Sequence, residues 1–153
     1  MIVSFAGHSR IAFTDRLKQA VKSELRKLLS EGGSLVCYLG GYGDFDALCA
    51  SACRELKREG GAAELVYVSP YRTLSEQARI SDRLRLGLYD SSLYPPIENV
   101  PPKFAILNRN EWMMSSADVI LTYVKHTYGG AYRSLQAAKA KGKRIIDMSR
   151  DFP

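Results

Sequence analysis

Short apolar runs alternate along the chain with segments whose hydrophobic positions recur at the helical period. The runs predict buried β-strands at residues 2–6, 35–39, 64–68, 119–124 and 143–148. The segments between them predict helices, among them residues 73–86, 103–116 and 131–140. We therefore expect an α/β, Rossmann-like three-layer domain with a mostly parallel sheet of about five strands.

Capping and breaking residues set the predicted boundaries. The first helix has start signals at Thr14 and Asp15 and stops at Gly32-Gly33, and the second ends at Gly60-Gly61. Residues 71–102 contain two Pro-Pro pairs, which forbid one continuous helix. This segment predicts an ordered excursion over the edge of the sheet.

Composition is that of an ordinary globular protein. With 153 residues, 46% of them hydrophobic and 25% charged, the chain fits one domain and excludes disordered, collagen-like and coiled-coil classes. The longest apolar runs are too short to span a bilayer, and residues 1–6 lack a basic leader and a cleavage site. We expect a cytoplasmic protein with no membrane partner.

Net charge, cysteines and histidines indicate which partners and metal sites to expect. The net charge of +6 favours anionic partners, although the basic residues are scattered at spacings typical of solvated helix faces. Cys37, Cys49 and Cys53 have no C-x-x-C spacing and predict small buried hydrophobic residues in a reducing compartment. The two histidines would need a third ligand to hold a metal, so no metal is expected.

Four loops should lie at the carboxyl edge of the sheet, where Rossmann-like folds bind their ligands. They cover residues 7–10, 40–46, 69–72 and 125–130. Two of them are glycine-rich and lead directly into helices, which would let backbone N–H groups and the helix dipole meet a phosphate. The same glycines could instead serve only to make tight connections.

The candidate side chains of this edge include both histidines and several cations, hydroxyls and tyrosines. Tyrosines such as Tyr42 and Tyr128 could stack on a base or simply pack. Asp44 and Asp46 could cap the second helix, bind a ribose or act as a general base. The candidate ligand-binding set is Gly7, His8, Ser9, Arg10, Gly40, Gly41, Tyr42, Gly43, Asp44, Asp46, Arg109, Asn110, Tyr128, Gly129, Gly130 and Arg133. The candidate catalytic carboxylates are Glu111 and Asp44.

Five segments together resemble the SLOG superfamily, most closely its small YpsA-like bacterial members. They are Gly-Gly-Tyr-Gly-Asp-Phe-Asp at 40–46, Arg-Asn-Glu-Trp-Met at 109–113, Ala-Asp at 117–118, Tyr-Gly-Gly-Ala at 128–131 and Ala-Lys-Ala-Lys-Gly-Lys at 138–143. Relatives in this superfamily include the DNA-uptake protein DprA, Lonely-Guy phosphoribohydrolases and sensor domains of antiphage systems. The resemblance implies a single nucleotide-binding domain over residues 1–153, a nucleotide or nucleotide-derived ligand, a homo-oligomer such as a dimer, and no cofactor.

The chain departs from the enzymes of that superfamily at their catalytic carboxylates. Lonely-Guy enzymes carry P-G-G-x-G-T-x-x-E, whereas residues 128–134 contain no carboxylate. The nucleophilic glutamate of nucleoside deoxyribosyltransferases would fall near Arg133 and their helix aspartate near Asn110. Only Glu111, Asp44 and Asp46 remain as candidates.

Three functions remain open. The first is a sensor or regulatory module that binds a nucleotide or a nucleotide-derived ligand. The alternative is a hydrolase or transferase acting on the N-glycosidic bond of nucleoside phosphates. Nucleic-acid binding is the third and is not favoured, because no basic stripe interleaved with aromatic residues is present.

Overall fold

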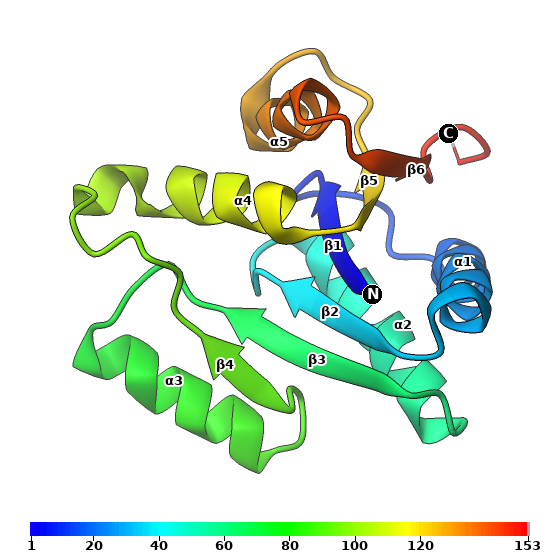
Figure 1. Cartoon of the computed structure of the whole chain (residues 1–153), viewed down its shortest axis with the longest axis horizontal. Helices are drawn as coiled ribbons and strands as arrows, with labels where there is room; N and C mark the ends of the chain where they lie inside the picture. The colour runs from blue at the N-terminus through cyan, green and yellow to red at the C-terminus, as the bar shows by residue number, and fades with distance from the viewer. Residues whose placement is uncertain (153) are drawn as a thin grey trace.

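Six parallel strands form one sheet with helices on both faces in the computed structural model, which describes residues 1–152 (Figure 1). The strands are β1 (Ile2–Gly7), β2 (Leu35–Leu39), β3 (Ala63–Val68), β4 (Ser91–Leu93), β5 (Val119–Tyr123) and β6 (Arg144–Asp147). The helices are α1 (Asp15–Gly32), α2 (Asp44–Arg58), α3 (Leu74–Arg85), the 3-10 turn η1 (Pro102–Phe104), α4 (Ala105–Ser116) and α5 (Gly129–Ala140). The predicted Rossmann-like fold class is confirmed.

Strand order places a switch point beside β1. The order across the sheet is β4-β3-β2-β1-β5-β6, and every neighbouring pair is parallel. The chain therefore builds outward from β1 in one direction as far as β4 and then returns to add β5 on the other side of β1. In such sheets a crevice opens between the carboxyl ends of the two strands at which the order reverses.

The first helix shows how local sequence sets these elements. The Thr14 hydroxyl oxygen accepts a hydrogen bond from the Leu17 N–H (3.2 Å), and Gly33 ends the helix with a φ of 77°. Between these caps the buried stripe comprises Leu17, Val21, Leu25 and Leu28, with the stem of Lys22 beside it. Both boundaries agree with the capping signals in the sequence.

One strand, β4, lies within the proline-rich segment that predicted only an excursion over the sheet edge. It pairs with β3 through Val66 opposite Ser91 and Val68 opposite Leu93. The strand is three residues long with the sequence Ser-Ser-Leu, so it has no apolar run or alternation to mark it. The sheet consequently has one strand more than the sequence predicts.

Separate hydrophobic cores lie on the two faces of the sheet. The larger core packs α1 and α2 and contains the three cysteines, which are free and buried as expected. Burial raises the pKa of the Cys49 thiol, which keeps it protonated. The smaller core lies under α4 and α5 around Met113, Met114 and Ile120. Among residues 1–152, no helix has both the length and the apolar character needed to cross a membrane.

Candidate functional site

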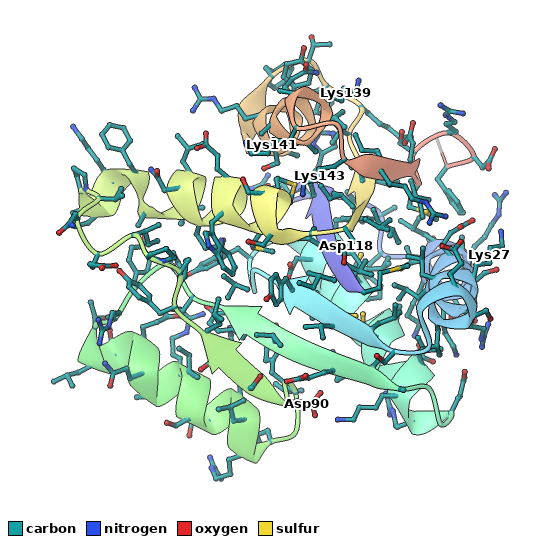
Figure 2. All side chains as sticks on the ribbon, in the orientation of Figure 1. Lys27, Asp90, Asp118, Lys139, Lys141 and Lys143 are labelled. Carbon is teal, nitrogen blue, oxygen red and sulfur yellow. The ribbon has the colours of Figure 1, made fainter. Side chains whose placement is uncertain are left out.

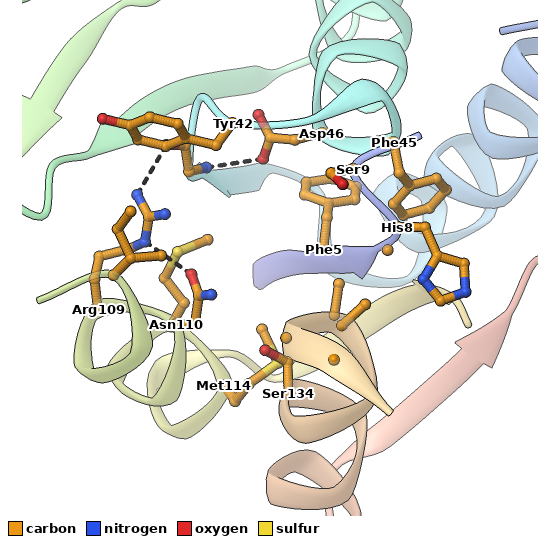
Figure 3. Close-up of a pocket in the computed structure, with 18 of the residues that line it drawn as sticks. Phe5, His8, Ser9, Tyr42, Phe45, Asp46, Arg109, Asn110, Met114 and Ser134 are labelled. Carbon is orange, nitrogen blue, oxygen red and sulfur yellow. Dashed lines mark hydrogen bonds between the residues drawn. The ribbon is translucent and has the colours of Figure 1, made fainter. Parts of the chain in front are cut away.

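A pocket of about 420 Å³ opens at the carboxyl edge of the sheet, at the switch point between β1 and β5 (Figure 3). Its walls come from the end of β1, the β2–α2 loop, α4 and the start of α5. It is lined by Phe5, Ala6, Gly7, His8, Ser9, Arg10, Gly40, Tyr42, Phe45, Asp46, Ile106, Arg109, Asn110, Met113, Met114, His126, Tyr128, Gly129, Gly130, Ala131 and Ser134.

Most of the ligand-binding residues expected from the sequence lie together in this lining. They are Gly7, His8, Ser9, Arg10, Gly40, Tyr42, Asp46, Arg109, Asn110, Tyr128, Gly129 and Gly130. Four others, Gly41, Gly43, Asp44 and Arg133, do not line the pocket. Glu111 lies on the exposed side of α4 and is also outside the lining.

Helix geometry explains why Arg133 lies outside and its neighbour Ser134 inside. Adjacent residues on a helix point about 100° apart, whereas residues four positions apart share a face. Ser134 follows Gly130 by four residues and is 6% exposed, while Arg133 is exposed to solvent. Because Gly129 and Gly130 both line the pocket, Arg133 and Ser134 each follow a lining glycine by four residues, and the spacing alone does not distinguish them.

Arg109 brings a buried cation to the wall of the pocket. The residue is 2% exposed, and its Nη1 donates to the carbonyl oxygens of Gly40 and Val68, each at 2.8 Å. Its Nε donates to the side-chain oxygen of Asn110 at 2.9 Å (Figure 3). Burial lowers the pKa of Arg109, although an arginine stays charged in proteins.

The nearby carboxylates of Asp46 and Glu76 favour the charged form of Arg109 but form no direct ion pair with it. Arg109 takes part in none of the ion pairs among residues 1–152, and its Nη2 has no hydrogen-bond partner there. A guanidinium with one donor still open can bind an anion, because charge-assisted hydrogen bonds are about twice as strong as neutral ones. The site therefore favours a negatively charged ligand.

Asp46 fixes the β2–α2 loop from inside. Its two carboxylate oxygens accept the backbone N–H groups of Gly40 (2.8 Å) and Gly41 (2.9 Å). Burial raises the pKa of Asp46, and these two hydrogen bonds and the charges of Arg109 and Arg83 oppose that rise. The N–H groups of this glycine pair are thus already bonded within the chain, so an anion would have to bind elsewhere.

The first two N–H groups of α2 are also already bonded within the chain. The N–H groups of Asp44 and Phe45 donate to the carbonyl oxygens of Ser9 (2.9 Å) and His8 (3.4 Å). The Asp44 carboxylate accepts the Ile11 N–H at 3.1 Å, which anchors the β1–α1 loop. Asp44 therefore lies outside the pocket in a structural contact.

The N-terminus of α5 differs from that of α2 because its first N–H groups are free. Within residues 1–152, Gly129, Gly130 and Ala131 have no acceptor for their backbone N–H groups, and Tyr128 supplies no side-chain cap. All three residues line the pocket, so these donors and the positive end of the helix dipole lie at its wall. Ser134, which makes no side-chain hydrogen bond in the described chain, adds a hydroxyl one turn further along.

His8 is held as a neutral acceptor. Its Nε2 accepts the backbone N–H of Lys125 at 2.7 Å, so this nitrogen carries no proton. Burial lowers the pKa of His8, and the neighbouring His126 and Lys125 lower it further. The His8 and His126 rings lie 4.5 Å apart between centroids.

Aromatic rings stand on two sides of the opening. The Tyr42 ring lies 5.5 Å from the guanidinium carbon of Arg109 and 5.9 Å from that of Arg79. On the other side the His126 and Tyr128 rings stack at 5.0 Å with an angle of 14° between their planes. Tyr128 is 69% exposed, which leaves its outer face open for a further planar group.

Two further observations bear on metal and charge. Within residues 1–152, no group of three or more His, Cys, Asp or Glu side chains is arranged to hold a metal ion. Lys139 in the last turn of α5, and Lys141 and Lys143 in the turn before β6, lie at the end of that helix opposite to the pocket (Figure 2). The positive charge of the chain is therefore not concentrated at this site.

Comparison with known proteins identifies the fold. No family model and no curated protein sequence matches the chain. Among solved structures, DprA from Helicobacter pylori, described with a single-stranded DNA binding mode, matches with a TM-score of 0.61 and 18% identity over 96% of this chain and 64% of that chain. DprA from Streptococcus pneumoniae matches with a TM-score of 0.63 and 15% identity over 95% of this chain and 49% of that chain. The Moco carrier protein of Chlamydomonas rheinhardtii matches with a TM-score of 0.52 and 15% identity over 97% of this chain and 75% of that chain.

At these identities the matches establish the fold alone. The chain has a Rossmann-like fold of the kind found in DprA, consistent with the resemblance of its motifs to the SLOG superfamily. It spans between half and two thirds of the length of the two DprA chains. The narrower likeness to YpsA-like members stays a prediction.

Proposed function

We propose that the pocket between β1 and β5 binds a nucleotide or a nucleotide-derived ligand, and that the protein acts as a sensor or regulatory module. The phosphate lies between Arg109, Ser134 and the free N–H groups of α5, with Arg10 at the rim. The base stacks on an exposed ring, either Tyr128 or Tyr42. The DNA-binding and Moco-carrier neighbours support this class of ligand by analogy of fold.

The observation that carries the proposal is the presence in one pocket of a buried guanidinium without a direct ion pair and of a helix N-terminus without a side-chain cap. Either feature alone has structural explanations. Together they place a fixed positive charge and several N–H donors around one cavity, which matches the charge and the acceptor oxygens of a phosphate.

Binding fits the site better than cleavage does. Asp46 is the one carboxylate that lines the described pocket, and both of its oxygens accept backbone N–H groups. These two hydrogen bonds hold the carboxylate toward the backbone of the β2–α2 loop, so it is not free to turn toward a bound ligand. We therefore expect no release of free base from a bound nucleoside phosphate over time.

Isothermal titration calorimetry against a panel of AMP, ADP, ADP-ribose, NAD and cyclic AMP tests the proposal. At least one of these compounds should bind, and Arg10→Ala should weaken that binding by about tenfold, since it removes a charge-assisted hydrogen bond. Arg133→Ala is the matched control, because Arg133 is an exposed arginine outside the lining. Its affinity should stay within about twofold of that of the unmodified protein.

Two results would overturn the proposal. One is a panel with no binding while oligothymidine binds with a steep dependence on salt, which would assign the protein to nucleic-acid binding. The other is an equal loss of nucleotide affinity in both arginine variants, which would place the ligand outside this pocket.

A further inference from the structure

A second groove, separate from the pocket, lies between α2 and the turn that joins α3 to β4. Two adjoining cavities of about 610 Å³ and about 200 Å³ form it, and both are lined by Arg54, Leu88 and Tyr89. Figure 1 shows α3 standing apart from α1 and α2. Glu76 is the one buried residue of α3, so this helix leaves the outer side of α2 uncovered.

Cations outnumber carboxylates in the lining of the groove. The cations are Arg54, Lys57, Arg58 and Arg83, and the carboxylates are Asp46 and Asp90. Asp90, at the start of β4 (Figure 2), pairs with Lys57 and accepts the Leu65 N–H at 2.8 Å. Asp46 is bonded to the β2–α2 loop, as described above. The three arginines form no ion pair within residues 1–152.

Arg83 carries the clearest sign of a missing partner. Its guanidinium carbon lies 5.2 Å from the centroid of the Tyr67 ring, which holds the side chain in place. Its Nη1 is buried and has no hydrogen-bond partner in the described chain. A buried donor without an acceptor costs free energy that a bound anion would recover.

Arg54 and the apolar side chains complete the shape of the groove. Nη1 of Arg54 donates to the carbonyl oxygen of Leu88 at 3.3 Å, so this arginine bridges from α2 to the opposite wall. Leu65, Leu86 and Tyr89 add apolar surface between the charged groups. Guanidinium groups beside leucine and aromatic surface fit a ligand that has an anionic end and an apolar body.

We propose that this groove is a second ligand site, which binds small organic phosphates. The phosphate contacts Arg54, Arg58 and Arg83, and an aromatic or aliphatic body lies on Leu86 and Tyr89. The combined cavities have the size of ordinary small-molecule sites. The site does not depend on what the pocket at the switch point binds.

Calorimetric titration of the whole chain with phenyl phosphate tests the proposal, with inorganic phosphate as the second probe. Phenyl phosphate should bind, and inorganic phosphate should bind at least about threefold more weakly, because it lacks the apolar body. Arg58→Gln and Arg83→Gln should each weaken the binding of phenyl phosphate by about fivefold or more. Arg58 is exposed, so its variant stays informative if Arg83→Gln fails to fold.

Two matched variants locate the binding event. Arg85→Gln changes another arginine of α3 that is exposed, pairs with Asp82 and lies outside the groove, and it should leave the affinity unchanged. Arg10→Ala, at the other pocket, should not affect the component of phenyl phosphate binding that Arg58→Gln and Arg83→Gln weaken. Absence of binding to the folded protein would overturn the proposal. So would binding that falls with Arg10→Ala and persists in both groove variants.

Discussion

Arg109 carries a positive charge into the interior of the protein and forms no direct ion pair within residues 1–152. Its fork of donors joins the ends of β2 and β3 through the carbonyl oxygens of Gly40 and Val68. The same residue thus has a structural role, which any substitution will disturb, and an electrostatic role toward the pocket. The two roles can be separated by comparing stability with ligand affinity.

Replacing Arg109 with methionine leaves both carbonyl oxygens without their donor. Each buried acceptor without a partner costs about 1–3 kcal/mol, so the loss of both should lower the free energy of unfolding by about 2–6 kcal/mol. Arg109→Lys keeps the charge but lacks the planar fork of donors. Its free energy of unfolding should lie between those of the unmodified protein and the methionine variant. Urea denaturation measures all three. A methionine variant as stable as the unmodified protein would show that these hydrogen bonds contribute nothing to stability.

His8 makes stability depend on pH. Its pKa in the folded protein lies below the ordinary value of 6.5, so the unfolded chain takes up the proton first as the pH falls. The stabilising contribution of neutral His8 is therefore present above about pH 6.5 and is lost as the pH falls through the lowered pKa. His126 and Lys125 face the same ring, and their positive charges act in the same direction.

The variant His8→Gln retains an acceptor and cannot titrate. Its stability relative to the unmodified protein should rise between pH 7.5 and pH 5 (roughly the range in which histidine changes charge), as measured by urea denaturation at each pH. A stability difference that does not change over this range would contradict the assignment of His8 as a neutral acceptor.

The sequence predicts which loops form the site, but it does not predict the contacts of single residues within them. The edge loops could be predicted, because parallel strands bring their carboxyl ends to one edge. The partners of individual groups could not. Nothing local to Asp46 indicates that it bonds to Gly40 and Gly41, since that contact depends on how the loop folds back onto α2. Arg133 and Ser134 are adjacent in sequence, and only the orientation of α5 decides which one enters the pocket.

Among the structural elements, the β2–α2 loop is the most tightly constrained. Gly41 has a φ of +75°, and a Cβ there would lie 2.2 Å from Cε2 of Tyr67. Gly41→Ala should therefore lower the free energy of unfolding by about 2–5 kcal/mol, through backbone strain and overpacking together. Gly60 is the control, because its φ is +94° but no atom lies within 4 Å of its added Cβ.

Gly60→Ala should cost only the strain of the left-handed conformation, about 1–2 kcal/mol. Thermal or urea denaturation measures how much stability each of the two glycine variants loses relative to the unmodified protein. Equal losses would mean that Tyr67 moves aside without cost and that the loop is not fixed by packing.

A different prediction concerns α3, which is held chiefly by polar contacts. Its buried residue, Glu76, accepts the Tyr67 hydroxyl at 2.6 Å and pairs with Arg79 at 3.1 Å, while Leu74 on the same helix is 84% exposed. Helices with little buried apolar surface open locally at low free-energy cost. The amides of α3 should exchange with deuterium faster than those of α2, which buries seven residues. Equal protection of the two helices would contradict this.

The elements also divide by how well their sequences define them. Periodicity and the start signal at Thr14 indicate α1, and helical periodicity indicates α3. Thr14 and Thr73 both accept N-cap hydrogen bonds, although such a signal is predicted from the sequence only for Thr14. The strand β4 has no such signal, and it forms because the chain returns alongside β3 after α3. Its position is a property of the tertiary fold, so local patterns could not reveal it.

In the whole molecule, two cavities with unpaired guanidinium groups lie on either side of the β2–α2 loop. Asp46 lines both of them, and its hydrogen bonds hold the loop that separates them. The pocket at the switch point combines its cation with free N–H groups of α5, whereas the second groove combines arginines with apolar surface. The two sites therefore would hold an anion through different groups.

The most direct test of the pocket follows the backbone amide signals of Gly129 and Gly130 by NMR during titration with the nucleotide that binds best. Because their N–H groups have no partner within the described chain, a bound phosphate should move both signals strongly. The signals of Gly33 and Gly142, which lie outside the pocket, should stay in place. Saturable nucleotide binding that leaves the amides of Gly129 and Gly130 unmoved would contradict phosphate binding at this helix.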